Sequence, residues 1–235
     1  MPKCSIQLLL KLYNELWTAG NLIENWKSSI VIPICKPGAE PKQLDSYRPI
    51  SLTSVLCKVM ERMATNRLTW FVEKNQLLNN VQTGFRRAKS TLDQLLRLHD
   101  DAHRSIRSKS ATQAVFLDFS KAFDLLWKEG LLHKLRKMGL TGNIYKWIEE
   151  FLTDRTIQVR VGTALSQTYK LENGTPQGSI ISPLLFILMM NDFPEFDDIN
   201  TKVSLFADDS AIWRSEKNLK YNNKKLQQHL DIITK

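Results

Sequence analysis

Residues 201–213 read TKVSLFADDSAIW, and this stretch decides the fold that the sequence predicts. Its apolar runs VSLF and SAIW are rich in strand-forming residues, and Asp208 and Asp209 lie between them. Two short strands around an acidic turn are typical of a β-hairpin. Because side chains stop alternating between the two faces at a turn, both carboxylates can point toward one spot. Aspartate is also common in ordinary turns, so the hairpin alone leaves a purely structural role open.

A second apolar run, AVFLDF at residues 114–119, carries Asp118 near its end and continues into a helical pattern. The run predicts a buried strand that stops at Asp118. Since an unpaired buried carboxylate is costly, Asp118 would need a partner, and a divalent cation is the natural one. One aspartate at a strand end and two at a hairpin tip could hold hard cations through oxygen. Two Mg²⁺ ions held in this way can activate an attacking oxygen and stabilise a leaving one.

Several motifs occur in the order LDFSKAFD, GTPQGSIISPLLF and FADD, with IPICKPG, SYRPISL and QTGFRRAKST upstream of them. In this order they resemble the reverse transcriptase domain of non-LTR retrotransposons, and the jockey-type elements in particular. The resemblance covers nearly the whole chain. It implies an RNA-directed DNA polymerase, in which a primer 3′-hydroxyl attacks the α-phosphate of a deoxynucleoside triphosphate and pyrophosphate leaves.

The resemblance assigns the catalytic and metal-binding roles to Asp118, Asp208 and Asp209. They would hold two Mg²⁺ ions, with Mn²⁺ as an alternative, and the partners would be an RNA template and a DNA primer. Two other interpretations stay open: an intron-type reverse transcriptase, and a non-catalytic remnant that binds nucleic acid without turnover.

The fold that the resemblance implies is an α+β right-hand polymerase. The fingers subdomain would comprise residues 1–85 and 126–172, and the palm residues 86–125 and 173–235. Such polymerases continue into a primer-gripping hairpin and a helical thumb, and often carry an endonuclease domain upstream. Since this chain stops one helix after the acidic turn, we expect a truncated fragment without a thumb, which extends primers poorly when isolated.

The same resemblance implies that five residues contact the incoming nucleotide. Arg48 and Lys36 bracket a loop rich in Pro and Gly and would bind the triphosphate. Arg48 is the stronger candidate, because a planar guanidinium can bind phosphate oxygens at two points. Phe123 would pack under the sugar and exclude a 2′-hydroxyl by steric contact. Gln177 and Gly178, in the sequence GTPQG, would line the nucleotide and template site.

A basic cluster in QTGFRRAKST is the predicted contact with the nucleic-acid backbone. Arg86, Arg87 and Lys89 would bind phosphates, and the ring of Phe85 could stack on a base. A solvated basic loop is the alternative.

The overall charge agrees with a polyanionic partner. In 235 residues, 33 Lys and Arg oppose 24 Asp and Glu, which gives a formal net charge of +9. A basic excess of this size favours nucleic acid, and a merely basic surface is the alternative.

Three isolated cysteines and the absence of a CxxC pair argue against a disulfide framework and a zinc knuckle. The sequence has no apolar run long enough for a signal-peptide core or a membrane span. We therefore expect an intracellular protein, in the nucleus or the cytoplasm, that is not secreted. His99 and His103 have the spacing of a zinc-protease helix, but no third ligand is evident, so an exposed helix face is favoured.

Apolar periodicity also predicts the other elements. The expected helices are 6–16, 54–73, 91–105, 129–138, 143–152, 182–191 and 219–233, and the expected strands outside the two motifs above are 26–34, 156–161 and 166–171.

Overall fold

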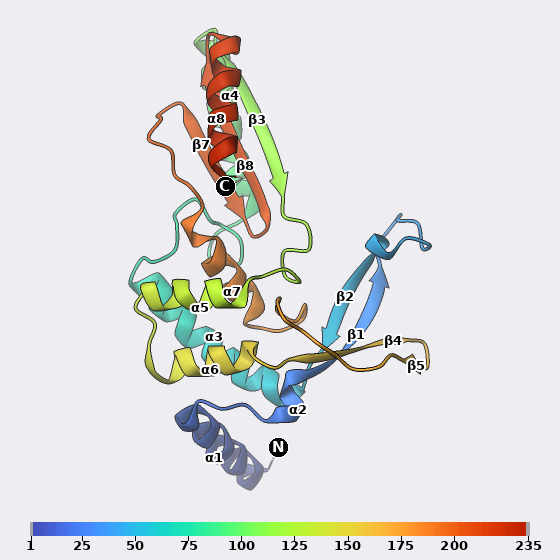
Figure 1. The fold of residues 1–235 in the computed structure, drawn as a ribbon. Helices are drawn as coiled ribbons and strands as arrows, with labels where there is room; N and C mark the ends of the chain where they lie inside the picture. Colours follow the sequence, from blue (N-terminus) through green and yellow to red (C-terminus); the bar gives the residue numbers. More distant parts are fainter. Residues whose placement is uncertain (1, 234–235) are drawn as a thin grey trace. The chain divides into compact units, whose positions relative to one another are not determined.

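Two units, each built on its own β-sheet, make up residues 2–233, which the computed structural model describes (Figure 1). The first unit comprises Met1–Leu77 and Lys121–Leu188, and the second comprises Leu78–Ser120 and Met189–Lys235. The chain changes unit after residues 77, 120 and 188. The expected fingers and palm subdomains change after residues 85, 125 and 172, and these names remain predictions for the two units.

The first unit is mainly helical. Its elements, in chain order, are α1 (Lys3–Ala19), α2 (Glu24–Lys27), β1 (Ser28–Cys35), the 3₁₀ turn η1 (Leu44–Ser46), β2 (Tyr47–Leu52), α3 (Val55–Lys74), α5 (Lys128–Lys137), α6 (Gly142–Leu152), β4 (Thr156–Val161), β5 (Ala164–Leu165), β6 (Tyr169–Lys170) and α7 (Ser182–Met189). The expected helices are confirmed within a few residues at each end. Helix α1 ends at Gly20, which adopts the left-handed conformation with φ of 71°.

The first sheet joins distant parts of the sequence. Strand β1 pairs antiparallel with β2 and parallel with β4. The register aligns Ile34 with Arg48 and Cys35 with Tyr47, so the two strands stay paired up to the loop rich in Pro and Gly. Lys36 and Arg48 therefore lie at the same end of the β1–β2 hairpin.

Helices α3, α5, α6 and α7 supply the core of the first unit. Their fully buried side chains include Leu68, Leu131, Trp147, Phe151 and Leu185. Trp147 and Phe151 lie one turn apart on α6, and their rings stack with centroids 5.5 Å apart. Burying aromatic rings of this size is a large favourable contribution to the folding of the unit.

The second unit consists of α4 (Thr91–Arg107), β3 (Ala111–Asp118), the 3₁₀ turn η2 (Met190–Asp192), β7 (Thr201–Phe206), β8 (Asp209–Glu216) and α8 (Leu219–Ile233). Its sheet has the order β3-β8-β7, and both strand pairs are antiparallel. The predicted hairpin is thus confirmed as β7 and β8. Ser90 and Asp93 form a capping box at the start of α4, which explains why that helix begins there.

Neighbouring residues of β8 show which helix covers each face of this sheet, since they point to opposite faces. Trp213 donates its indole N–H to Asp101 of α4, at 2.9 Å. Arg214 donates to Asn222 of α8, at 2.8 Å. The sheet therefore lies between α4 and α8 (Figure 1).

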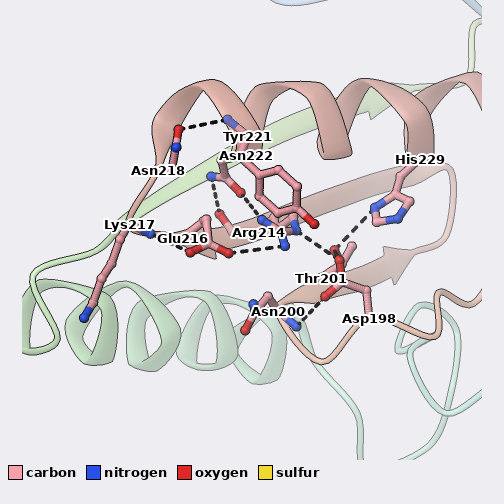
Figure 2. Close-up of polar contacts among 10 residues, drawn as sticks. All are labelled: Asp198, Asn200, Thr201, Arg214, Glu216, Lys217, Asn218, Tyr221, Asn222 and His229. Carbon is pink, nitrogen blue, oxygen red and sulfur yellow. Dashed lines mark hydrogen bonds and ion pairs between the residues drawn. The ribbon is translucent and has the colours of Figure 1, made fainter.

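Arg214 is the centre of a polar network that joins α8 to the hairpin (Figure 2). Its side chain is 3% exposed, and its Nε donates to Asp198 at 3.0 Å. The backbone carbonyl of Arg214 accepts from the Asn222 side-chain amide at 3.1 Å, and Asn222 is fully buried. Because a buried guanidinium needs partners for its donors, these contacts fix the position of α8 on the sheet.

His229 connects the same network to the loop before β7. Its Nδ1 lies 3.3 Å from the hydroxyl of Thr201 (Figure 2). Its ring stacks on that of Phe196, with centroids 4.2 Å apart. Burial lowers the pKa of His229 below its ordinary value near 6.5, and the positive charge of Arg214 acts in the same direction, whereas Asp198 opposes it.

The lowered pKa of His229 predicts a loss of stability in mild acid. Over the pH range between the two pKa values, His229 is neutral in the folded protein, whereas in the unfolded chain it already binds a proton. The contribution of His229 to the free energy of unfolding is therefore complete above about pH 6.5 and is lost as the pH falls through the folded-state pKa. We expect the free energy of unfolding to fall between pH 7.5 and 5, and less steeply in His229→Gln. Urea unfolding at several pH values measures both slopes; equal slopes would contradict this role of His229.

Two strand predictions need correction. The strand expected at 26–34 begins only at Ser28, because Glu24–Lys27 forms the short helix α2. Of the strand expected at 166–171, only residues 169–170 form a strand, β6, while β5 ends just before the expected range; both pair with β4. Between them, the Ser166 hydroxyl accepts the Val159 amide at 2.9 Å, and this side-chain bond interrupts the ladder.

No helix within residues 2–233 is both long enough and apolar enough to cross a bilayer.

Candidate active site

The predicted catalytic aspartates meet at one end of the second sheet. Asp118 is the last residue of β3 and Asp209 is the first residue of β8, and the register pairs them directly across the two strands. Paired residues of an antiparallel sheet have Cα atoms about 4.5–5.5 Å apart and side chains on the same face. Asp208 is the second residue of the two-residue turn that precedes β8. The backbone thus places Asp118 and Asp209 side by side, with Asp208 next to Asp209 in the chain.

The turn has an unusual first residue. Ala207 has φ of 57°, in the left-handed region that favours glycine. A positive φ at the first central position lets a two-residue turn follow the twist of its strands, so the tight connection between Phe206 and Asp209 is maintained at the expense of strain at Ala207.

The negative charges at this end of the sheet affect one another. Partial burial raises the pKa of Asp209, and the carboxylates of Asp208 and Asp118 raise it further. Three neighbouring carboxylates repel one another, and a bound cation would offset that repulsion.

The environment of Asp118 differs from the prediction. Asp118 is exposed, and β3 alternates between half-buried and exposed residues from Gln113 on, with Phe116 71% exposed. The run AVFLDF is therefore not a strand buried on both faces, because β3 is the edge strand of a sheet whose two faces are covered unequally. Burial therefore does not force Asp118 to find a partner, contrary to the prediction; what a cation would relieve is the mutual repulsion of Asp118, Asp208 and Asp209.

The donor set fits a hard divalent cation, since it consists of carboxylate oxygens. Residues 2–233 contain no group of three or more His, Cys, Asp or Glu side chains that is already arranged to hold a metal ion. His99 and His103 also belong to no such group, although their rings lie 4.3 Å apart on α4. Metal binding by Asp118, Asp208 and Asp209 remains a prediction.

The loop GTPQG lies against β2 and the segment after Lys121 in the first unit. The Ser51 amide of β2 donates to the Gln177 carbonyl at 2.7 Å. The Gln177 side-chain amide donates to both carboxylate oxygens of Asp124, at 3.1 and 3.2 Å. Desolvation raises the pKa of Asp124, although the residue as a whole stays exposed, and the contacts with Gln177 and Lys121 act in the opposite direction.

Gly178 cannot be replaced without moving this loop. Its φ is 120°, and a Cβ added there would lie 2.9 Å from the Ser51 carbonyl oxygen. A fully buried residue supports the loop from the other side: Glu61 of α3 accepts the Ser179 hydroxyl and the Ile180 amide, both at 2.6 Å. The sequence pattern did not indicate Glu61, because one acid within an amphipathic helix looks like a solvent-facing residue.

Phe123 is attached to the same loop. Its carbonyl accepts the Thr175 amide at 2.8 Å, and its ring lies 5.2 Å from that of Phe186 in α7. The ring is half-buried, so one part packs on the core and another part remains accessible.

Lys36 and Arg48 differ in their present contacts. Both are exposed at the end of the β1–β2 hairpin. Lys36 donates to the Asp45 carbonyl at 2.9 Å, whereas no contact of the Arg48 guanidinium is recorded among the described residues. The Arg48 guanidinium therefore keeps its N–H donors available, whereas one donor of Lys36 is occupied.

The basic segment after Gly84 divides into a structural and an accessible part. The Arg86 guanidinium donates to the carbonyls of Asn79 and Gln82, at 3.1 and 3.3 Å, and so holds its own loop together. Phe85, Arg87 and Lys89 are exposed, and Phe85 has φ of 56°. A phosphate contact is thus better supported for Arg87 and Lys89 than for Arg86.

Comparisons with known proteins agree with these observations. A family model described as reverse transcriptase (RNA-dependent DNA polymerase) matches residues 34–235. The RNA-directed DNA polymerase from the mobile element jockey of Drosophila melanogaster is 32% identical over 239 residues, which cover 99% of this chain. The probable RNA-directed DNA polymerase from transposon BS of the same species is also 32% identical, with the same coverage. The chain spans 26% of the length of each of these relatives.

A solved structure has a similar fold. Telomerase from Candida albicans, in complex with the TWJ fragment of telomeric RNA, matches 94% of this chain and 42% of its own, with a TM-score of 0.62 and 11% identity. At that identity the likeness concerns the fold alone, and it confirms the predicted fold class.

Proposed function

Because the chain belongs to the reverse transcriptase family, we propose that the protein it forms part of is the RNA-directed DNA polymerase of a retrotransposon. The observation that supports this most strongly is the direct pairing of Asp118 with Asp209 beside Asp208. The substrates would be deoxynucleoside triphosphates, a DNA primer and an RNA template. Such a polymerase would act where its nucleic-acid substrates are, in the nucleus or the cytoplasm.

The three aspartates would hold two divalent cations, Mg²⁺ or Mn²⁺, through their carboxylate oxygens. When bound, such ions supply the positive charge that polarises the attacking hydroxyl and stabilises the leaving oxygen. The aspartates' own contribution is to fix that charge at the end of a rigid sheet, since phosphoryl transfer depends mainly on positioning and electrostatic stabilisation.

The remaining candidates would bind and orient the substrates. Arg48, with Lys36 in a weaker role, would neutralise the triphosphate, and Gln177 and Gly178 would present polar groups to the nucleotide and the template base. Phe85, Arg87 and Lys89, with a smaller share for Arg86, would contact the nucleic acid. These are roles that a basic surface with an exposed aromatic ring can perform.

Primer extension on an RNA template tests the proposed activity. We expect weak extension that requires Mg²⁺ in the unmodified chain and no measurable extension in Asp208→Ala. Template binding without any extension, also after a downstream thumb segment is joined to the chain, would identify the non-catalytic alternative. Extension that survives in Asp208→Ala would remove the acidic turn from the mechanism.

Sugar selection gives a separate prediction for Phe123. In Phe123→Val the smaller side chain leaves room for a 2′-hydroxyl, so the preference for deoxynucleotides, measured as a ratio of kcat/KM values, should fall by about tenfold or more. Leu125→Val is the control, because Leu125 is a large apolar residue of the same segment that is 65% exposed. An unchanged ratio in an active Phe123→Val variant would leave Phe123 with a packing role only.

A further inference from the structure

The buried segment Val81–Gly84 lies beside the acidic turn in the second unit. Thr83 donates its amide to the Leu205 carbonyl at 2.9 Å, and the Leu205 amide donates to the Val81 carbonyl at 3.1 Å. These bonds form a parallel bridge onto β7, two residues before the turn. The segment therefore reaches the turn from the edge of the sheet opposite β3.

Gln82 contacts the turn itself. Its side-chain oxygen Oε1 accepts two backbone amides, that of Gly84 at 2.8 Å and that of Ala207 at 3.0 Å. Since both partners are N–H donors, only the oxygen of the amide can face them, and the orientation of the side chain is fixed. Gln82 is 1% exposed, and its Nε2 has no hydrogen-bond partner within residues 2–233.

An unpaired buried donor is unfavourable, so Gln82 is not simply a core-filling residue. The buried position of Gln82 is explained if its side-chain oxygen, which accepts the Ala207 amide, is the essential group. Ala207 has a strained positive φ, and its amide is tied to Gln82 by a bond that spans 125 residues of sequence. The bond holds the strained residue immediately before Asp208 in one conformation.

Gly84 completes the contact by having no side chain. A Cβ added at Gly84 would overlap the Ala207 amide nitrogen and lie 2.9 Å from the Ala207 Cα and the Phe206 carbonyl carbon. These neighbours are backbone atoms, which cannot move aside as a flexible side chain can. Gly84 is also not among the glycines with positive φ, so the close approach to the turn, rather than its own conformation, requires glycine.

We propose that Gln82 and Gly84 are positioning residues, which hold the Ala207–Asp208 turn in the conformation that polymerisation requires. The proposal rests on the proposed function for its catalytic consequence, but the hydrogen bond from Ala207 to Gln82 can be tested without any activity. The motif QTGFRRAKST would then have two parts: Gln82–Gly84 holds the turn, and the residues from Phe85 on bind nucleic acid.

The experiment compares Gln82→Met with Gln94→Met. Methionine has nearly the same shape as glutamine but no amide oxygen. Gln94 of α4 is a matched control, since it is buried and holds the same segment through the Val81 carbonyl and the Thr83 hydroxyl, at 2.8 and 3.1 Å, and has no recorded hydrogen bond to the turn. Gly84→Ala is a second, independent variant of the proposed contact.

Amide hydrogen exchange at Ala207 is the first measurement. We expect exchange to become about tenfold faster or more in Gln82→Met and Gly84→Ala, and to change little in Gln94→Met. Steady-state nucleotide incorporation is the second: kcat should fall by about a hundredfold in the first two variants, with KM for the nucleotide nearly unchanged, because a shift of about 1 Å at the reacting groups has that effect.

The outcomes separate the two proposals. Equal changes in Gln82→Met and Gln94→Met, in either measurement, would show a general structural role and overturn the positioning proposal. Faster exchange at Ala207 in a chain that extends no primer, even with a downstream thumb segment joined to it, would support the contact and overturn the proposed function. Unchanged exchange in both Gln82→Met and Gly84→Ala would overturn the contact itself.

Discussion

Asp118→Ala is expected to lower nucleotide incorporation by about a thousandfold or more. The substitution removes one of three carboxylates that would hold the catalytic cations, and charge stabilisation by such ions is worth several kcal/mol, with each 1.4 kcal/mol equal to a factor of ten. Single-turnover incorporation on a primed RNA template measures the loss without interference from product release.

Asp197→Ala is the matched control for Asp118→Ala. Asp197 is an exposed aspartate of the same unit and lies in the loop before β7, at the end of the hairpin away from the acidic turn. We expect its replacement to leave the rate within about twofold of the unmodified protein, as for most surface positions. Comparable losses in both variants would mean that Asp118 acts through general charge or folding rather than through a metal.

Arg214→Ala is expected to destabilise the second unit by about 3 kcal/mol. Removing the guanidinium leaves Asp198 and Asn222 without their partner. Removing one partner of a buried ion pair costs about 3–5 kcal/mol. The lower end of this range applies because the Asp198 side chain is 23% exposed. For a chain of this size the melting temperature should fall by about 6–12 °C.

Arg107→Ala is the control that shows how far the loss of an exposed arginine alone changes the melting temperature. Arg107 is exposed in the last turn of α4, and we expect its replacement to change the melting temperature by about 2 °C at most. The melting temperature of Arg214→Lys should lie between those of Arg214→Ala and Arg107→Ala, since lysine keeps the charge but lacks the planar guanidinium that reaches several acceptors. Thermal unfolding followed by circular dichroism measures all three, and equal melting temperatures for Arg214→Ala and Arg107→Ala would contradict the account of the network.

Local patterns in the sequence were sufficient for most of the fold. Helix α8 was predicted from its first to its last residue, and the hairpin of β7 and β8 was predicted around the acidic pair. Both follow from periodicity and turn chemistry within about fifteen residues, where neighbours in sequence are neighbours in space. The spaced motifs also indicated which three aspartates to consider together.

Environments that depend on distant residues were harder to predict. The apolar run before Asp118 suggested a buried strand, but the exposure of Phe116 depends on which strand occupies the edge of the sheet. Gln82 and Glu61 were missed because their partners lie 125 and 118 residues away, and a hydrogen bond between such distant positions leaves no periodic signal in the sequence. Their common feature is a polar side chain in a buried position, which only the structure makes visible.

The direct test of the central claim is whether Asp118, Asp208 and Asp209 bind divalent cations together. Mn²⁺ binding can be followed by electron paramagnetic resonance in the presence of primer, template and a non-hydrolysable deoxynucleotide, since triphosphate oxygens complete such sites. We predict two bound Mn²⁺ ions in the unmodified protein, and binding weakened by about tenfold or more in both Asp118→Asn and Asp209→Asn. Equal Mn²⁺ binding by the unmodified protein and both variants would contradict the claim that these carboxylates form a shared metal site.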